Sequence, residues 1–223
     1  MKIEALPQVF EADIHQIDGA LARYLGNFDG PAGHYGMMQY LFGFADHELR
    51  TLVKAEYLSR GKRLRPILCA LSCRMMGLGG QAAQTVMMAC EVMHCASLVH
   101  DDIQDRDSLR WGRPTLNALF GKVYELLLGL RAHDVPDAQV VDVMAVFNRA
   151  HASMCEGQHL DLTFKYSDGV GIPAYFDMVT RKTAAPCVCI AEAISILAGS
   201  PAETRDDLRQ FGQWQQDTGR NGL

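Results

Sequence analysis

The stretch EVMHCASLVHDDIQDRDSLRWGRPT, residues 91–115, decides the fold and the chemistry expected of this chain. Its first half has the apolar composition of a buried helix. On a helix, four of its polar residues share one face, because they fall at positions i, i+3, i+7 and i+11: His94, Ser97, Asp101 and Asp105. Asp102 lies one step around the helix. The spacing therefore predicts three carboxylates that converge at the end of a buried helix.

Three carboxylates this close repel one another unless cations lie between them. Oxygen ligands on a rigid helix suit Mg²⁺, which completes its octahedral shell with water and substrate phosphate. Two arginines follow directly, and a guanidinium matches phosphate oxygens in a bidentate way. The residues predict a Mg²⁺–diphosphate site with metal ligands Asp101, Asp102 and Asp105 and phosphate contacts from Arg110 and Arg113. A solvated helix end whose charges pair among themselves is the alternative.

The composition describes a globular chain of 223 residues, long enough to bury a real core. The net charge of -5 gives no reason to expect a nucleic-acid partner. No run of about 18 apolar residues and no signal-peptide pattern occurs, so we expect a cytoplasmic protein without a transmembrane segment. Seven cysteines, an odd number, lie mostly in apolar helical runs and are expected to be reduced core thiols.

The sequence predicts helices over 8–26, from Met37 or Phe44 to Leu58, over 66–76, over 81–97, and from Gly157 and Lys182 onward. A capping box of Ser200 and Glu203, with Pro201 in the first turn, predicts another helix from Ser200. Glycine-rich residues 29–36 are predicted to be a loop. No alternating stretch is long enough to predict a sheet.

A second basic segment, SRGKRLRP at residues 59–66, precedes a helix that Pro66 can open in its first turn. Lys62, Arg63 and Arg65 beside a helix N-terminus would suit a phosphate, although a basic loop without function is the alternative. His94 is expected to be an ordinary core histidine, and most methionines of this region are expected to fill the core.

The pattern HxxSLxHDDxxD, followed by RxGRPT, resembles the first aspartate-rich motif of the trans-isoprenyl diphosphate synthases, the polyprenyl synthetase family. GKRLRP is similar to the family motif whose Lys and second Arg, here Lys62 and Arg65, bind the diphosphate of isopentenyl diphosphate. GQHLDL resembles a motif whose Gln and Asp, here Gln158 and Asp161, face the cavity. Lys182 and Thr183 resemble the pair beside the allylic substrate.

The resemblance runs from about Ser59 to the end of the chain. It implies an all-α fold, a single domain over residues 1–223 that forms a helical bundle around a deep central cavity. Members of this family are usually homodimers. The implied reaction is head-to-tail prenyl transfer, in which an allylic prenyl diphosphate ionises and isopentenyl diphosphate attacks the cation.

Each site residue has an implied role in that reaction. Three aspartates, Asp101, Asp102 and Asp105, would hold Mg²⁺ against the allylic diphosphate, and Arg110 and Lys182 would clamp the same group. Thr183 would offer an oxygen dipole to the developing cation. Isopentenyl diphosphate would be held by Lys62, Arg63 and Arg65, with Arg113 nearby. Apolar helix walls would shield the carbocation from water, and diphosphate would accept the final proton.

The residues before Asp101 carry a prediction of product length. Ala96 and Ser97 are small where bulky residues close the pocket of the family's short-chain members, and Met93 lies a turn deeper. We therefore expect a product of about twenty carbons or longer, with Met93 as a candidate pocket floor.

Two stretches depart from the family pattern. Phe120-Gly121 runs directly into KVYELLLGLRAHDVP, without the family's Gly-Asp-containing helical segment. FGQW at 211–214 is followed by QQDTGRNGL, without the second aspartate-rich motif. We expect that internal segments and a C-terminal part of the natural chain are absent from this sequence; a genuine internal deletion is the alternative.

The missing motif leaves other functions open. Without it, the protein would be a non-catalytic prenyl synthase subunit or a diphosphate-binding protein. A terpene cyclase also ionises an allylic diphosphate, but GKRLRP favours a transferase because a cyclase binds no isopentenyl diphosphate. Trp111, where many relatives have a second Arg, weakens the expected affinity for isopentenyl diphosphate.

Overall fold

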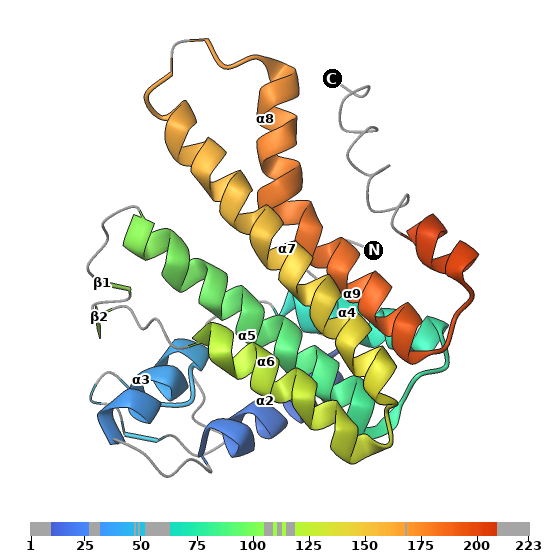
Figure 1. Cartoon of the computed structure of the whole chain (residues 1–223). Helices are drawn as coiled ribbons and strands as arrows, with labels where there is room; N and C mark the ends of the chain where they lie inside the picture. Colours follow the sequence, from blue (N-terminus) through green and yellow to red (C-terminus); the bar gives the residue numbers. More distant parts are fainter. Residues whose placement is uncertain are drawn as a thin grey trace. The chain divides into compact units, whose positions relative to one another are not determined.

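The computed structural model describes residues 10–26, 32–46, 48, 50–51, 63–104, 109–110, 113–114, 119–167 and 169–208, and helices dominate these ranges (Figure 1). The α-helices are α2 (Glu11–Gly26), α3 (Ala32–Phe42), α4 (Leu64–Met75), α5 (Gly80–Gln104), α6 (Leu119–Leu128), α7 (Asp137–Phe164), α8 (Ile172–Val179) and α9 (Ala185–Leu197). A 3₁₀ segment (Gly129–His133) follows α6, a π-helix (Thr180–Ala184) joins α8 to α9, and residues 202–208 are also helical. The all-α prediction is confirmed.

In the described ranges, extended structure is limited to very short pieces. Strands β1 (Leu109–Arg110) and β2 (Arg113–Pro114) pair antiparallel, with Arg110 opposite Arg113. An isolated bridge joins Ala45 to Thr51. The sequence predicted no sheet, and pieces this short leave no alternating pattern by which they could be found.

Contacts divide the chain into two compact units. Unit 1 consists of Met1–Ala70 and Met87–Val123, and unit 2 consists of Leu71–Val86 and Tyr124–Leu223. The aspartates of α5 and the basic segment before α4 belong to unit 1. The Gln158–Asp161 and Lys182–Thr183 motifs belong to unit 2.

In unit 1, α2 and α3 pack against each other. α2 buries residues at helical spacing, as its sequence predicted: Ile17, Ala20, Leu21 and Leu25. α3 corrects two predictions, because it begins at Ala32, inside the predicted loop, and ends at Phe42 rather than at Leu58. Glycine costs a helix about 1 kcal/mol per residue, but burial of the apolar residues of α3 outweighs that cost: Met38, Leu41 and Phe42.

In unit 2, α7 packs against α8, the π-helix and α9. α7 begins at Asp137, well before Gly157, where the sequence predicted its start. α9 ends in a glycine cap: Gly199 has a positive φ of 66°, and the Ser200 N–H donates to the Ser195 carbonyl over 2.9 Å. The helix over 202–208 confirms the one predicted after Ser200.

All seven cysteines are free thiols, and five of them are buried. Within the described ranges, Gly80–Asp101 is the one helical stretch long and apolar enough to cross a membrane by length and composition. Since 61% of its most apolar window is buried inside the protein, it also fits the core helix that the sequence predicted.

Candidate functional site

α5 carries aspartates at its C-terminal end. Asp101 is half-buried, Asp102 lies in the same last turn, and Asp105 lies outside the described residues. The last turn of α5 contains no basic residue. Because a helix C-terminus carries partial negative charge, carboxylates there are unfavourable unless a cation is close. Oxygen donors in this electrostatic setting fit a divalent cation such as Mg²⁺.

The residues predicted to limit product length lie inside unit 1. Met93 and Ala96 are buried, with exposed fractions of 2% and 3%. Ser97 is half-buried, and its hydroxyl donates to the main-chain oxygen of His94 over 2.8 Å. Because this hydrogen bond occupies the hydroxyl proton, the expected effect of Ser97 on product length comes from its small volume.

The two arginines after the aspartates meet in the β1–β2 ladder. Arg110 and Arg113 occupy directly opposed positions. The backbone thus brings together two residues that the sequence assigned to two different diphosphates.

Arg63 occupies an unexpected environment. It is 9% exposed, and each of its three guanidinium nitrogens donates to a protein acceptor. Nε reaches Asp18 Oδ1 of α2 over 3.0 Å, Nη1 reaches Glu91 Oε1 of α5 over 2.6 Å, and Nη2 reaches the Phe42 carbonyl over 2.8 Å. The sequence predicted that Arg63 contacts isopentenyl diphosphate, whereas in the structure its guanidinium faces protein oxygens.

The charge of Arg63 is secured by its carboxylate partners. Burial alone would lower the pKa of Arg63, but Glu91 and Asp18 outweigh that effect, so its pKa is raised above the ordinary value. Arg65 differs: it is half-buried, and its Nε is buried without a hydrogen-bond partner among the described residues. Lys62 lies outside the described residues.

In unit 2, the two predicted motifs meet. Lys182 Nζ lies 2.7 Å from Asp161 Oδ2, and both side chains are about one-third exposed. Lys182 sits in the middle of the π-helix, beside the exposed Thr183. π-Helical turns are rare in proteins as a whole, and those that occur often lie at functional sites. The sequence predicted both motifs, but nothing in it indicated the π-helix.

Gly157 explains how α7 approaches the π-helix. A Cβ at this position would collide with the main-chain nitrogen of Lys182 and would lie 2.9 Å from the carbonyl carbon of Arg181. Real Cβ atoms essentially never lie that close to backbone atoms. Glycine is therefore required here for close approach of two backbones.

Gln158, the next residue, is 3% exposed. Its Nε2 and Oε1 are buried, and neither has a hydrogen-bond partner in the part of the chain that the structure describes. Leaving a buried amide unsatisfied costs about 1–3 kcal/mol. Such a group suits a position beside a bound water or ligand.

A cavity of about 350 Å³ lies in unit 2 between α7, the π-helix and α9. Its charged side chains are already paired: Arg149 with Glu192 over 2.8 Å, and Arg181 with Asp177 over 3.0 Å. The hydrogen bond that Arg181 donates to the Asp177 carboxylate is the main reason that the pKa of Arg181 is raised. Among the described residues, neither Asp161 nor Lys182 nor any other predicted site residue lines this cavity.

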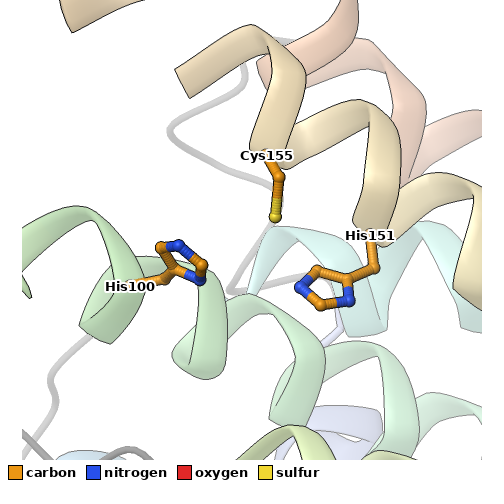
Figure 2. Close-up of side chains that lie close together, drawn as sticks. All are labelled: His100, His151 and Cys155. Carbon is orange, nitrogen blue, oxygen red and sulfur yellow. The ribbon is translucent and has the colours of Figure 1, made fainter. Parts of the chain in front are cut away.

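Figure 2 shows polar side chains to which the sequence assigned no role. His151 and Cys155 project from one side of α7, one turn apart. His100 belongs to α5 in the other unit, where its ring lies edge-on to that of Phe120, with the ring centroids 6.3 Å apart. Two ligand atoms from one helix do not make a zinc site, which needs at least three protein ligands, so we assign the α7 pair no metal.

Known proteins resemble this chain over the region that contains the predicted motifs. The family model described as polyprenyl synthetase matches residues 46–215. A geranylgeranyl pyrophosphate synthase from Geoglobus acetivorans is 33% identical over 162 residues, covering 68% of this chain and 51% of that protein. An all-trans-nonaprenyl-diphosphate synthase (geranyl-diphosphate specific) from Rhodobacter capsulatus is 34% identical over 157 residues, covering 68% of this chain and 48% of that protein.

A solved structure shows the same fold. The polyprenyl synthetase from Streptomyces coelicolor A3(2) superposes with a TM-score of 0.76 at 24% identity, covering 95% of this chain and 62% of that one. The chain belongs to the polyprenyl synthetase family and has its all-α isoprenoid synthase fold. It spans about half the length of the curated relatives that it matches.

Proposed function

We propose that this protein is an isoprenyl diphosphate synthase, which extends an allylic prenyl diphosphate with isopentenyl diphosphate in a Mg²⁺-dependent reaction. The observation that carries the proposal is the end of α5, where aspartates occupy a helix C-terminus that has no basic residue in its last turn. Family membership and the names of the relatives support it.

The chain's own residues would divide the work as follows. Aspartates 101, 102 and 105 would hold Mg²⁺, which when bound supplies positive charge to the departing diphosphate. Lys182, held by Asp161 over 2.7 Å, would bind the same diphosphate together with Arg110. Arg65 and Lys62 would bind isopentenyl diphosphate. Thr183 and Gln158 would direct their dipoles toward the reacting chain.

The test is consumption of isopentenyl diphosphate by the purified protein with an allylic diphosphate and Mg²⁺. Asp101→Asn should reduce kcat/KM about 100-fold or more, because one metal ligand loses its charge. Asp142→Asn, at an exposed position of α7, is the control and should leave activity unchanged. Binding of both diphosphates by the wild type without turnover would favour a non-catalytic prenyl synthase subunit instead.

Product length has its own expected result. Ala96→Phe should shorten the product. Ala96 is only 3% exposed, so the bulky ring would have to occupy the proposed product pocket. Chromatography of the dephosphorylated products would measure the change. Ser97→Ala adds no volume and should keep the product at about twenty carbons or longer. Unchanged product length in Ala96→Phe would mean that this face of α5 is not the pocket wall.

The remaining predictions concern the whole protein. We propose a single isoprenoid synthase domain that acts as a homodimer in the cytoplasm, on the basis of the family resemblance. Sedimentation of the purified protein would determine its oligomeric state.

A further inference from the structure

Arg63 joins the basic segment to three other elements of unit 1. Its guanidinium binds Asp18 of α2, Glu91 of α5 and the carbonyl of Phe42 at the end of α3, over 3.0, 2.6 and 2.8 Å. The side chains of Glu91 and Asp18 are 4% and 19% exposed. Since all three contacts lie within the same unit, they hold one end of α4 in place from three directions.

The backbone of Arg63 depends on these contacts. Its φ is 49°, in the left-handed region that is unfavourable for any residue with a Cβ. Its carbonyl accepts a hydrogen bond from the Ile67 N–H over 3.0 Å, so the residue directly precedes the first turn of α4. Such a conformation persists when surrounding interactions stabilise it by more than it costs. We attribute that stabilisation to the side-chain hydrogen bonds of Arg63.

Glu91 also connects this position to the aspartates. It lies on the same helix as Asp101, ten residues earlier, which corresponds to about 15 Å along the axis. The Arg63–Glu91 ion pair therefore fixes the position of the start of α4 relative to the end of α5. Arg65 lies in that start, and its Nε is buried without a hydrogen-bond partner among the described residues.

We propose that Glu91 and Asp18 are positioning residues for isopentenyl diphosphate: by holding Arg63 in its left-handed conformation, they orient the start of α4 so that Arg65 meets the diphosphate. This inference rests on the proposed function. It assigns Arg63 itself to the support of the site and leaves the contact with the diphosphate to Arg65 and Lys62.

The test is a comparison of affinities by calorimetry on the full chain in Mg²⁺ buffer. Glu91→Gln keeps the size of the side chain and removes its charge. The affinity for isopentenyl diphosphate should fall about tenfold or more, as for other losses of a supporting contact, while the affinity for the allylic diphosphate stays within about twofold. Glu91→Asp, which keeps the charge one methylene shorter, should give an intermediate affinity.

Glu192→Gln is the matched control, because Glu192 is also buried and ion-paired to an arginine, at 5% exposure, in unit 2. It should leave the affinity for isopentenyl diphosphate unchanged. If Glu91→Gln does not fold, Asp18→Asn provides the same comparison at a more exposed carboxylate. Unaltered isopentenyl diphosphate affinity in a folded Glu91→Gln or Asp18→Asn protein would overturn the inference. Failure of the wild type to bind isopentenyl diphosphate would instead overturn the proposed function, and the inference with it.

Discussion

Gly157→Ala is expected to destabilise the protein and, if the proposed function holds, to weaken the binding of an allylic diphosphate. The new Cβ would collide with the main chain of Lys182 and Arg181, and backbone cannot move aside as a flexible side chain can. Forcing extra volume into a packed site costs about 1–3 kcal/mol, and contact with backbone places this site at the upper end. The π-helix would have to move away from α7, which would lengthen the 2.7 Å contact between Asp161 and Lys182.

Thermal unfolding followed by circular dichroism would measure the loss of stability. Titration calorimetry would measure the affinity for the allylic diphosphate. Gly121→Ala is the control, since it is also a helical glycine and a Cβ there meets nothing within 4 Å. Because alanine favours helix by about 1 kcal/mol over glycine, this variant should be at least as stable as the wild type. Equal stability of the two variants would contradict the close approach at Gly157.

Glu91→Met should produce the second large effect, a loss of about 3–5 kcal/mol in the free energy of unfolding. The substitution roughly keeps the side-chain volume but leaves the guanidinium of Arg63 buried beside an apolar group. Asp18, with its more exposed side chain, compensates only in part. Urea unfolding monitored by fluorescence would measure the change.

A double variant separates loss of the pair from loss of one partner. Replacing both residues, Arg63→Met with Glu91→Met, should recover part of the stability, because no charge is then left buried opposite a missing partner. If the double variant were less stable than Glu91→Met alone, the main cost would lie in the contacts of Arg63 with Asp18 and Phe42.

The parts of the fold that could be predicted from the sequence are those with strong local signals. α5 is apolar along most of its length, so the helix could be predicted, and the closely spaced acids at its end are the basis on which a metal site is proposed there. The Lys182–Thr183 and Gln158–Asp161 motifs could be found as patterns. The contact between Lys182 and Asp161 follows only from the way α7 packs on the π-helix.

Other features depend on contacts between distant residues. Arg63 lies 28 residues from Glu91 and 45 residues from Asp18, and no local pattern distinguishes a buried arginine from one that binds a substrate. The glycines of residues 29–36 predict a loop and a later start for α3, whereas burial of its apolar residues sustains a helix from Ala32. The sequence predicted only the part of α7 from GQHLDL onward, whereas the helix begins twenty residues earlier, at Asp137.

The π-helix at Thr180–Ala184 has a consequence for the rotation of the helices around it. A π turn uses about one more residue than an α turn, and one residue corresponds to about 100° around a helix. The faces of α8 and α9 are therefore out of phase, although their sequences follow one another without a break. Lys182 and Thr183 lie within this phase shift, so they belong to neither helix's regular pattern of buried and exposed positions.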